Sequence, residues 1–168
     1  MMKSLLCCVL LLLAVPCAQA GSTAYLKIGD IEGESQRAGH EGEIDILAWS
    51  WGAESNRRGA CLTDIELLKS IDKSSPQLLM GQANRMVYPT AVISVRRDSG
   101  DAHLDYLVIT LSNVQVSRFQ TSNSAGDTLP TESFSLNFEK IEYQYTVQED
   151  DGRAGETVSA VITPERCR

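Results

Sequence analysis

The chain has 168 residues, a length that suits a single domain. Its 15 lysine and arginine residues are outnumbered by 22 aspartate and glutamate residues, which gives a formal net charge of −7. Because a protein that binds nucleic acid needs a basic face to neutralise phosphates, this balance argues against a nucleic-acid partner.

The first twenty residues have the pattern of a secretory signal peptide. Lys3 provides a positive charge, an apolar run extends from Leu5 to Val15, and Ala18-Gln19-Ala20 is a small-residue cleavage site. The run is too short for a membrane span, which takes about 20 apolar residues. The sequence predicts a signal peptide at residues 1–20, followed by an exported domain at residues 21–168. Its expected location is the periplasm or the outside of the cell.

The cysteines fit this prediction. Removal of residues 1–20 leaves Cys61 and Cys167 out of the 5 cysteines in the chain. In an oxidising compartment an even number of remaining cysteines favours a disulfide, although two unpaired thiols are the alternative. Cys61 falls in a segment, Ala53–Leu62, that the sequence predicts to be a loop.

Most of the exported domain has the two-residue alternation of β-strands. In the segment Glu43–Trp51, the face with Trp49 and Trp51 is expected in the core, and the opposite face, with Ala48 and Ser50, is smaller. The segment Leu104–Leu111 is apolar on both faces, so both should be covered. Strands are predicted at Ala24–Ile28, Glu43–Trp51, Thr90–Arg97, Leu104–Leu111, Glu132–Val147 and Glu156–Thr163.

In the segment Glu132–Val147 the alternation of apolar and polar residues shifts by one position midway. Its first half places Phe134 and Phe138 on one face, whereas the apolar residues of its second half have the other parity. A slip of one residue would send an apolar set to solvent, so a bulge or bend near Glu139-Lys140 is predicted. Phe138 is expected in the core. The pattern predicts a mainly β fold, a compact two-sheet barrel or sandwich with one short flanking α-helix.

The helix is expected within Ser70–Met86, which reads SIDKSSPQLLMGQANRM. Either Ser75 caps it with Pro76 at its first position, or Ser74 caps it in a capping box. Leu79, Ala83 and Met86 share one apolar stripe at helical spacing. Leu79 is therefore a predicted core residue, and Leu79→Asp is expected to abolish folding.

Catalytic and metal-binding patterns are weak. The 2 histidines lie outside any nucleophile motif. Asp101, His103 and Asp105 would share a strand face and could contact a metal, but a polar strand start is the stronger interpretation. The alternating carboxylates Asp30, Glu32 and Glu34 favour a solvated edge over a calcium site. The sequence predicts no catalytic residues, no metal, no cofactor and no enzymatic activity.

Six segments of the exported domain carry a family resemblance. In chain order they are AYLKIGDIEGES (Ala24–Ser35), HEGEIDILAWSWG (His40–Gly52), IDKSSPQLL (Ile71–Leu79), YPTAVISVRR (Tyr88–Arg97), YLVITLSNVQVS (Tyr106–Ser117) and TESFSLNFEKIEYQY (Thr131–Tyr145). Together they strongly resemble the Hcp family, the tube-forming proteins of bacterial type VI secretion systems. The resemblance implies a β-barrel or sandwich, a homo-hexameric ring that can stack into a tube, and partners among other type VI secretion components and effectors.

By this resemblance, Ala48 and Ser50 would face the lumen of the ring, where effector cargo is held. The alternative is that Ser50 is an ordinary exposed strand hydroxyl. At the level of the whole protein the alternative to a ring subunit is an exported binding module with the same fold that no longer builds tubes.

Overall fold

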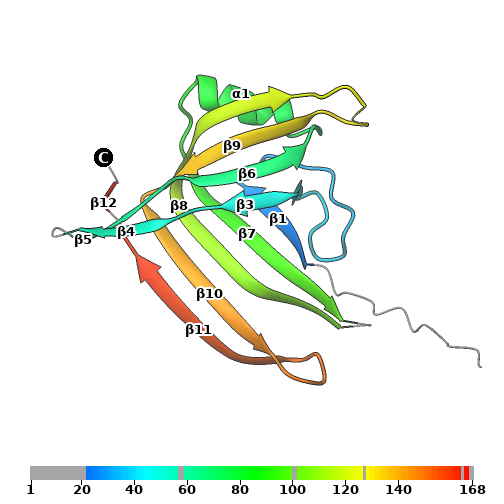
Figure 1. Cartoon of the computed structure of the whole chain (residues 1–168), viewed down its shortest axis with the longest axis vertical. Helices are drawn as coiled ribbons and strands as arrows, with labels where there is room; N and C mark the ends of the chain where they lie inside the picture. Colours follow the sequence, from blue (N-terminus) through cyan, green and yellow to red (C-terminus); the bar gives the residue numbers. More distant parts are fainter. Residues whose placement is uncertain (1–21, 57–58, 100–101, 127, 164, 167–168) are drawn as a thin grey trace, which may run out of the picture.

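A computed structural model describes residues 22–56, 59–99, 102–126, 128–163 and 165–166. These ranges form a mainly β structure with a single short helix, as predicted (Figure 1). The helix is α1 (Ser75–Ala83). The strands are β1 (Ser22–Ile28), β2 (Ile44–Ile46), β3 (Ala48–Ser50), β4 (Ala53–Asn56), β5 (Gly59–Leu62), β6 (Ile65–Ser70), β7 (Tyr88–Ser99), β8 (Ala102–Ser122), β9 (Thr131–Asn137), β10 (Lys140–Gln148), β11 (Ala154–Ile162) and β12 (Glu165–Arg166).

The strands form two antiparallel layers that share the long strand β8. The first layer has the order β2-β1-β7-β8-β10-β11, and the second has the order β8-β9-β6-β3. The first part of β8 pairs with β10, and the part beyond Gln115 pairs with β9. Strand β8 therefore joins the two layers through its own backbone.

Two bends lie opposite each other where the layers separate. Asn113 has a positive φ of 53° between the two halves of β8. Glu139 lies between β9 and β10, where its carboxylate accepts a hydrogen bond from Asn113 Nδ2 at 2.7 Å, and its N–H donates to the carbonyl of Ser112. The predicted bend near Glu139-Lys140 is confirmed. Its physical reason is that β9 and β10 must follow the two differently directed halves of β8.

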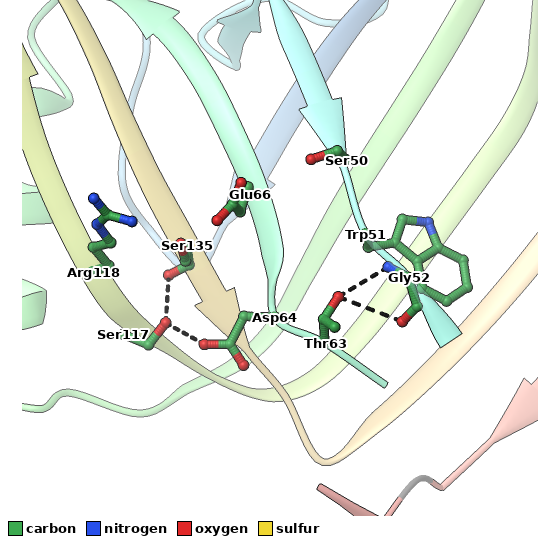
Figure 2. A pocket seen from close by; sticks show the side chains of 9 residues that line it. All are labelled: Ser50, Trp51, Gly52, Thr63, Asp64, Glu66, Ser117, Arg118 and Ser135. Carbon is green, nitrogen blue, oxygen red and sulfur yellow. Dashed lines mark hydrogen bonds between the residues drawn. The ribbon is translucent and has the colours of Figure 1, made fainter. Parts of the chain in front are cut away.

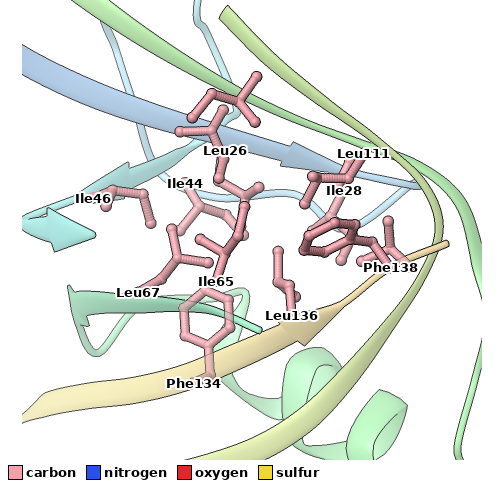
Figure 3. Close-up of a cluster of buried hydrophobic side chains, with 14 of the residues drawn as sticks. Leu26, Ile28, Ile44, Ile46, Ile65, Leu67, Leu111, Phe134, Leu136 and Phe138 are labelled. Atoms are coloured by element: carbon pink, nitrogen blue, oxygen red, sulfur yellow. The ribbon is translucent and has the colours of Figure 1, made fainter. Parts of the chain in front are cut away.

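The core lies between the layers and is almost entirely aliphatic (Figure 3). Phe138, predicted to be buried, lies in this core, and Trp49 and Trp51 are half-buried and pack against its margin. The core faces of the strands interdigitate as expected for stacked sheets. Its fully buried members include Leu26, Ile28, Ile44, Ile65, Ile93, Ile109, Leu111 and Leu136.

The segment Glu43–Trp51 does not form the single strand that the sequence predicts. It divides at Leu47 into β2, which pairs with β1, and β3, which pairs with β6. Ile44 and Ile46 are buried, although their positions alternate with those of Trp49 and Trp51 and place them on the face predicted to be the smaller one. Leu47, on the predicted core face, is exposed. The prediction of one core face along the whole segment is wrong, because the chain crosses from one layer to the other at Leu47.

The predicted buried face of α1 is also wrong. Leu79 is 50% exposed, and Met86 is exposed as well. The buried helix residues are Ser75, Leu78 and Gly81. A side chain at Gly81 would place its Cβ 2.2 Å from the hydroxyl of Tyr88, so this glycine allows the helix to lie directly on a core tyrosine. The close approach of Tyr88 sets the rotation of α1 and turns Leu79 toward solvent.

The serine pair at the start of α1 does not cap the helix as predicted. Ser74 occupies the N-cap position without a side-chain cap hydrogen bond, and its hydroxyl donates instead to Asp72. Ser75 Oγ donates to Glu132 Oε2 at 2.6 Å and accepts a hydrogen bond from Lys69 Nζ at 2.9 Å. Lys69 is 0% exposed and lies 2.9 Å from Glu132 and 2.8 Å from Asp72. The serine pair therefore belongs to a buried ionic network that fastens the helix to β6 and β9.

The segment Ala53–Leu62 is a hairpin of β4 and β5 rather than a loop. Strand β12 joins the hairpin in parallel, with Glu165 opposite Cys61 and Arg166 opposite Leu62.

Among the described helices, none is long and apolar enough to cross a membrane.

Candidate functional site

The outer face of the second layer carries the residues predicted to face a lumen. Ala48 and Ser50 are both exposed there. The register places Ser50 opposite Glu66, Glu66 opposite Ser135, and Ser135 opposite Arg118. Directly opposite residues in an antiparallel pair share a face. We call this surface the serine face, and its defining residues are Ala48, Ser50, Glu66, Arg118, Ser133 and Ser135.

The serine face is hollowed at the end where β3 leaves the sheet. A cavity of about 500 Å³ is lined by residues of β3, β6, β8 and β9 and by the segment before β6 (Figure 2). A second hollow, of about 180 Å³, is lined by Ala48, Ser50, Glu66 and Ser133 among others. Both predicted lumen residues therefore border hollows in an otherwise flat sheet surface. The larger cavity is lined by Ser50, Trp51, Gly52, Thr63, Asp64, Glu66, Ser117, Arg118 and Ser135.

The polar groups in the larger cavity hold one another in place. Asp64 accepts a hydrogen bond from Ser117 Oγ at 2.5 Å (Figure 2). Its other carboxylate oxygen accepts one from Asn137 Nδ2 at 2.7 Å. Thr63 Oγ1 accepts a hydrogen bond from the N–H of Gly52 at 2.9 Å. Both Asp64 oxygens are thus occupied, and none of the described lining residues is a histidine or cysteine. The cavity therefore presents hydroxyl and carboxylate groups in fixed positions, where they can hydrogen-bond to a polar partner.

The residues considered for a metal lie in different surroundings. His103 is exposed, Asp105 pairs with Arg96 and His40, and Asp101 lies outside the described residues. Glu32 lies 3.0 Å from Lys73 Nζ, and Glu34 accepts a hydrogen bond from the N–H of Lys73 at 3.0 Å. These carboxylates tie the loop after β1 to the start of α1. Within the described part of the chain, His, Cys, Asp and Glu form no group of three or more that could hold a metal.

A second polar cluster, which sequence reasoning missed, surrounds His40 on the outer face of the first layer. His40 is buried and stacks on Tyr25, with ring centroids 4.2 Å apart. Its Nδ1 lies 2.8 Å from Glu43 Oε2, and its Nε2 lies 3.1 Å from Asp105 Oδ1. Arg96 Nε donates to the same Asp105 oxygen at 2.7 Å. The only local signal in the sequence is Glu43 three residues after His40.

Asp105 makes the stability of this cluster depend on pH. Burial acts to raise the pKa of Asp105, but the hydrogen bonds from Arg96 and His40, together with their charges, outweigh it and hold the pKa below its ordinary value of 3.8. A carboxylate with a lowered folded-state pKa stabilises the fold above its unfolded-state pKa, and this contribution is lost as pH falls through the folded-state value.

We therefore expect Asp105→Asn to lower the free energy of unfolding at pH 7, because Arg96 and His40 lose a charged partner. The difference from the wild type should shrink as the pH falls below about 4, because the wild-type Asp105 then loses its charge as well. Urea unfolding of both proteins between about pH 5 and pH 2 measures it. A difference that grows over this acid range would contradict the assignment.

The fold and the serine face define a class of protein: a two-layer β structure with one flanking helix and a hollowed polar sheet face. A model of the family described as "Type VI secretion system effector, Hcp" matches residues 25–145. Protein hcp1 of Pseudomonas aeruginosa (strain PAO1) is 38% identical over 138 residues, covering 76% of this chain and 85% of that protein. The chain belongs to the Hcp family.

Solved structures agree with this assignment. A type VI secretion system effector from Yersinia pestis matches with a TM-score of 0.71 and 30% identity, over 83% of this chain and 98% of that one. Hcp1 from Salmonella typhimurium matches with a TM-score of 0.73 and 28% identity, over 84% of this chain and 94% of that one. The similarity therefore extends over most of the length of each relative and not over one motif.

Proposed function

We propose that the mature chain is a non-enzymatic subunit of a homo-hexameric ring in a type VI secretion system, with the serine face as the wall of the lumen. The observation that carries the proposal is the family match over residues 25–145, together with solved relatives that align over almost their full length. The ring works with other type VI secretion components and effectors, and it stacks into a tube.

The chemistry of the serine face supports its role as a lumen wall. Three of its six defining residues are serines, and its exposed charges include one carboxylate, Glu66, and one guanidinium, Arg118. Arg118 donates to Gln120 on the same strand at 3.0 Å. A wall of this composition can hydrogen-bond to varied surfaces without strong attraction, which suits a lumen that holds effector cargo and then releases it.

The molar mass of the mature protein tests the ring directly. Light scattering of residues 21–168 should give the mass of a ring, and dilution should dissociate it reversibly. A strict monomer over a wide concentration range would overturn the ring. That result would favour the second candidate, an exported binding module with the Hcp fold. The observation that favours this candidate is the signal-peptide pattern at residues 1–20.

Export and cleavage form a separate part of the proposal. Residues 1–20 direct the chain to the periplasm or the outside of the cell, and residues 21–168 form the functional domain. Fusion of residues 1–20 to a reporter that is active only in the periplasm should give a signal. A silent reporter would mean that this segment is not an export signal.

We also propose a disulfide between Cys61 and Cys167. Cys61 is buried, and it lies opposite Glu165 where β12 pairs with β5. Cys167 lies outside the described residues, two positions after Glu165 in the sequence. Closure of a loop of about 100 residues would stabilise the fold by about 4 to 5 kcal/mol in the chain-entropy model.

Cys61→Ser should therefore lower the free energy of unfolding by about 4 to 5 kcal/mol. Reduction of the wild type should have a similar effect, and reduction of the variant should have none. Urea unfolding with and without dithiothreitol measures both. Titration of two free thiols in unreduced, denatured protein would show that the bridge is absent.

A further inference from the structure

A groove separate from the serine face lies between α1, the loop after β1 and the start of β7, and we call it the α1 groove. Its volume of about 460 Å³ falls within the range typical of small-molecule sites, roughly 300 to 1,000 Å³. None of its lining residues belongs to the serine face. Asp30 carries the only charge among the lining residues that the structure describes. The apolar lining residues are Ile31, Pro76, Met80, Met86, Tyr88 and Pro89.

The aromatic wall of the α1 groove is held in place by two glycines. Tyr88 is 8% exposed. A Cβ atom at Gly29 would lie 2.8 Å from Tyr88 Cδ1, and one at Gly81 would lie 2.2 Å from the Tyr88 hydroxyl. The ring therefore lies directly against the backbone at both positions. A groove with such a fixed wall exists before a ligand arrives, which reduces the entropy lost on binding.

Tyr88 presents a hydroxyl without a partner. Among the described residues, nothing forms a hydrogen bond with this hydroxyl. Every fully buried side-chain nitrogen or oxygen in the same part of the chain has a partner, so the hydroxyl must be accessible from outside. Burial raises the pKa of Tyr88, so the hydroxyl keeps its proton at neutral pH. A mostly buried tyrosine in the wall of the groove thus offers one free hydrogen-bonding group.

The carboxylate of Asp30 is the second polar group without a partner. Asp30 is exposed, and its side chain forms no ion pair or hydrogen bond within the described residues. The neighbouring carboxylates differ, because Glu32 pairs with Lys73 Nζ and Glu34 accepts a hydrogen bond from the Lys73 N–H. The α1 groove therefore has a single uncompensated negative charge at its entrance. A positively charged group is the complement of this charge.

Two methionines make the apolar wall adaptable. Met80 is 58% exposed and Met86 is 47% exposed, although both side chains are apolar. Methionine has three rotatable bonds and a polarizable sulfur, so it can fit apolar bodies of different shapes. An apolar groove with a few polar groups is the usual form of a small-molecule site. The matching ligand has an apolar body and one cationic end.

We propose that the α1 groove binds an alkylammonium ion, a small molecule with a hydrocarbon chain and a protonated amine. The chain lies against Met80, Met86 and Tyr88, and the ammonium group pairs with Asp30. An anionic amphiphile of the same length is rejected, because its head group would meet the carboxylate of Asp30. This site does not depend on the proposed ring.

Methyl resonances of methionine report on the α1 groove alone. Met80 and Met86 are the only methionines of residues 21–168, and both line the groove. In mature protein labelled with carbon-13 at the methionine methyl groups, octylammonium chloride should shift both resonances until saturation. Sodium octanoate, which has a chain of the same length and the opposite charge, should bind at least about fivefold more weakly.

Two pairs of variants test the placement of the ligand. Asp30→Asn should weaken octylammonium binding about three- to fivefold and remove the preference over octanoate. Glu32→Gln removes a carboxylate of the same loop that does not line the groove, and it should leave the affinity unchanged. Met80→Lys should abolish binding as observed at Met86, whereas Leu79→Lys, at the adjacent exposed position outside the groove, should not. All four positions are exposed, so the circular dichroism spectra should match that of the wild type.

Three results would overturn the proposal. Resonances that do not move at high octylammonium concentration would show that the α1 groove is not a site. Equal affinity for octylammonium and octanoate, or equal losses in Asp30→Asn and Glu32→Gln, would show that Asp30 does not select the ligand. Binding that persists in Met80→Lys would place the ligand elsewhere on the protein.

Discussion

Leu78→Asp should prevent the chain from folding, whereas Leu79→Asp should change the free energy of unfolding by no more than about 1 kcal/mol. Leu78 is 0% exposed in the core, and Leu79 is 50% exposed. A buried carboxylate without a partner costs several kcal/mol, in addition to the lost apolar contacts. That sum is comparable to the entire stability of a typical domain, about 5 to 15 kcal/mol.

The two variants control for each other. They are adjacent in α1, introduce the same charge and carry the same loss of helix propensity, so only the burial of the replaced leucine differs. Near-ultraviolet circular dichroism and urea unfolding of both proteins measure the result. A folded Leu78→Asp protein together with an unfolded Leu79→Asp protein would restore the helix orientation that the sequence pattern predicts.

Lys69→Met should lower the free energy of unfolding by about 3 to 5 kcal/mol. The reason is that Glu132, which is 2% exposed, would keep its buried charge without the ammonium group now 2.9 Å away. The hydroxyl of Ser75 would remain as a donor to Glu132, but it carries no charge. Urea unfolding at neutral pH gives the difference directly.

Two further variants separate the cost of an unpaired charge from the value of the pair. Lys69→Met combined with Glu132→Leu should recover most of the lost stability, because apolar replacement of both partners removes the desolvation penalty. Lys73→Met breaks the exposed pair with Glu32 and should cost at most about 1 kcal/mol. A double variant as unstable as Lys69→Met alone would contradict this account.

Periodicity predicted β1, β7, β9, β10 and β11, the first half of β8 and the bend near Glu139, since these depend on residues close in sequence. It did not predict β6, the second half of β8 or the hairpin of β4 and β5, whose segment was predicted to be a loop. It also placed Phe138 correctly in the core. It failed at Leu47, where the parity of the buried face reverses because the chain changes layers. That crossing depends on the pairing of β2 with β1 and of β3 with β6, which joins segments distant in sequence.

The helix shows a second kind of failure. Leu79, Ala83 and Met86 form a valid apolar stripe, but the contact between Gly81 and Tyr88 selects the face with Leu78. Likewise, Ser74 and Ser75 are good capping residues, but their local sequence does not indicate that the hydroxyl of Ser75 binds Lys69 and Glu132 instead. Of the serine face, only Ala48 and Ser50 were predicted, because Glu66, Arg118 and Ser135 join them through strand register alone.

The sharing of β8 between the layers has a mechanical consequence. This strand has 21 residues, and it is hydrogen-bonded to β10 along its first part and to β9 along its second. At about 3.3 Å per residue it extends roughly 70 Å along its curved path. A pull on one layer is therefore carried into the other by covalent backbone, so the two layers resist sliding apart under load.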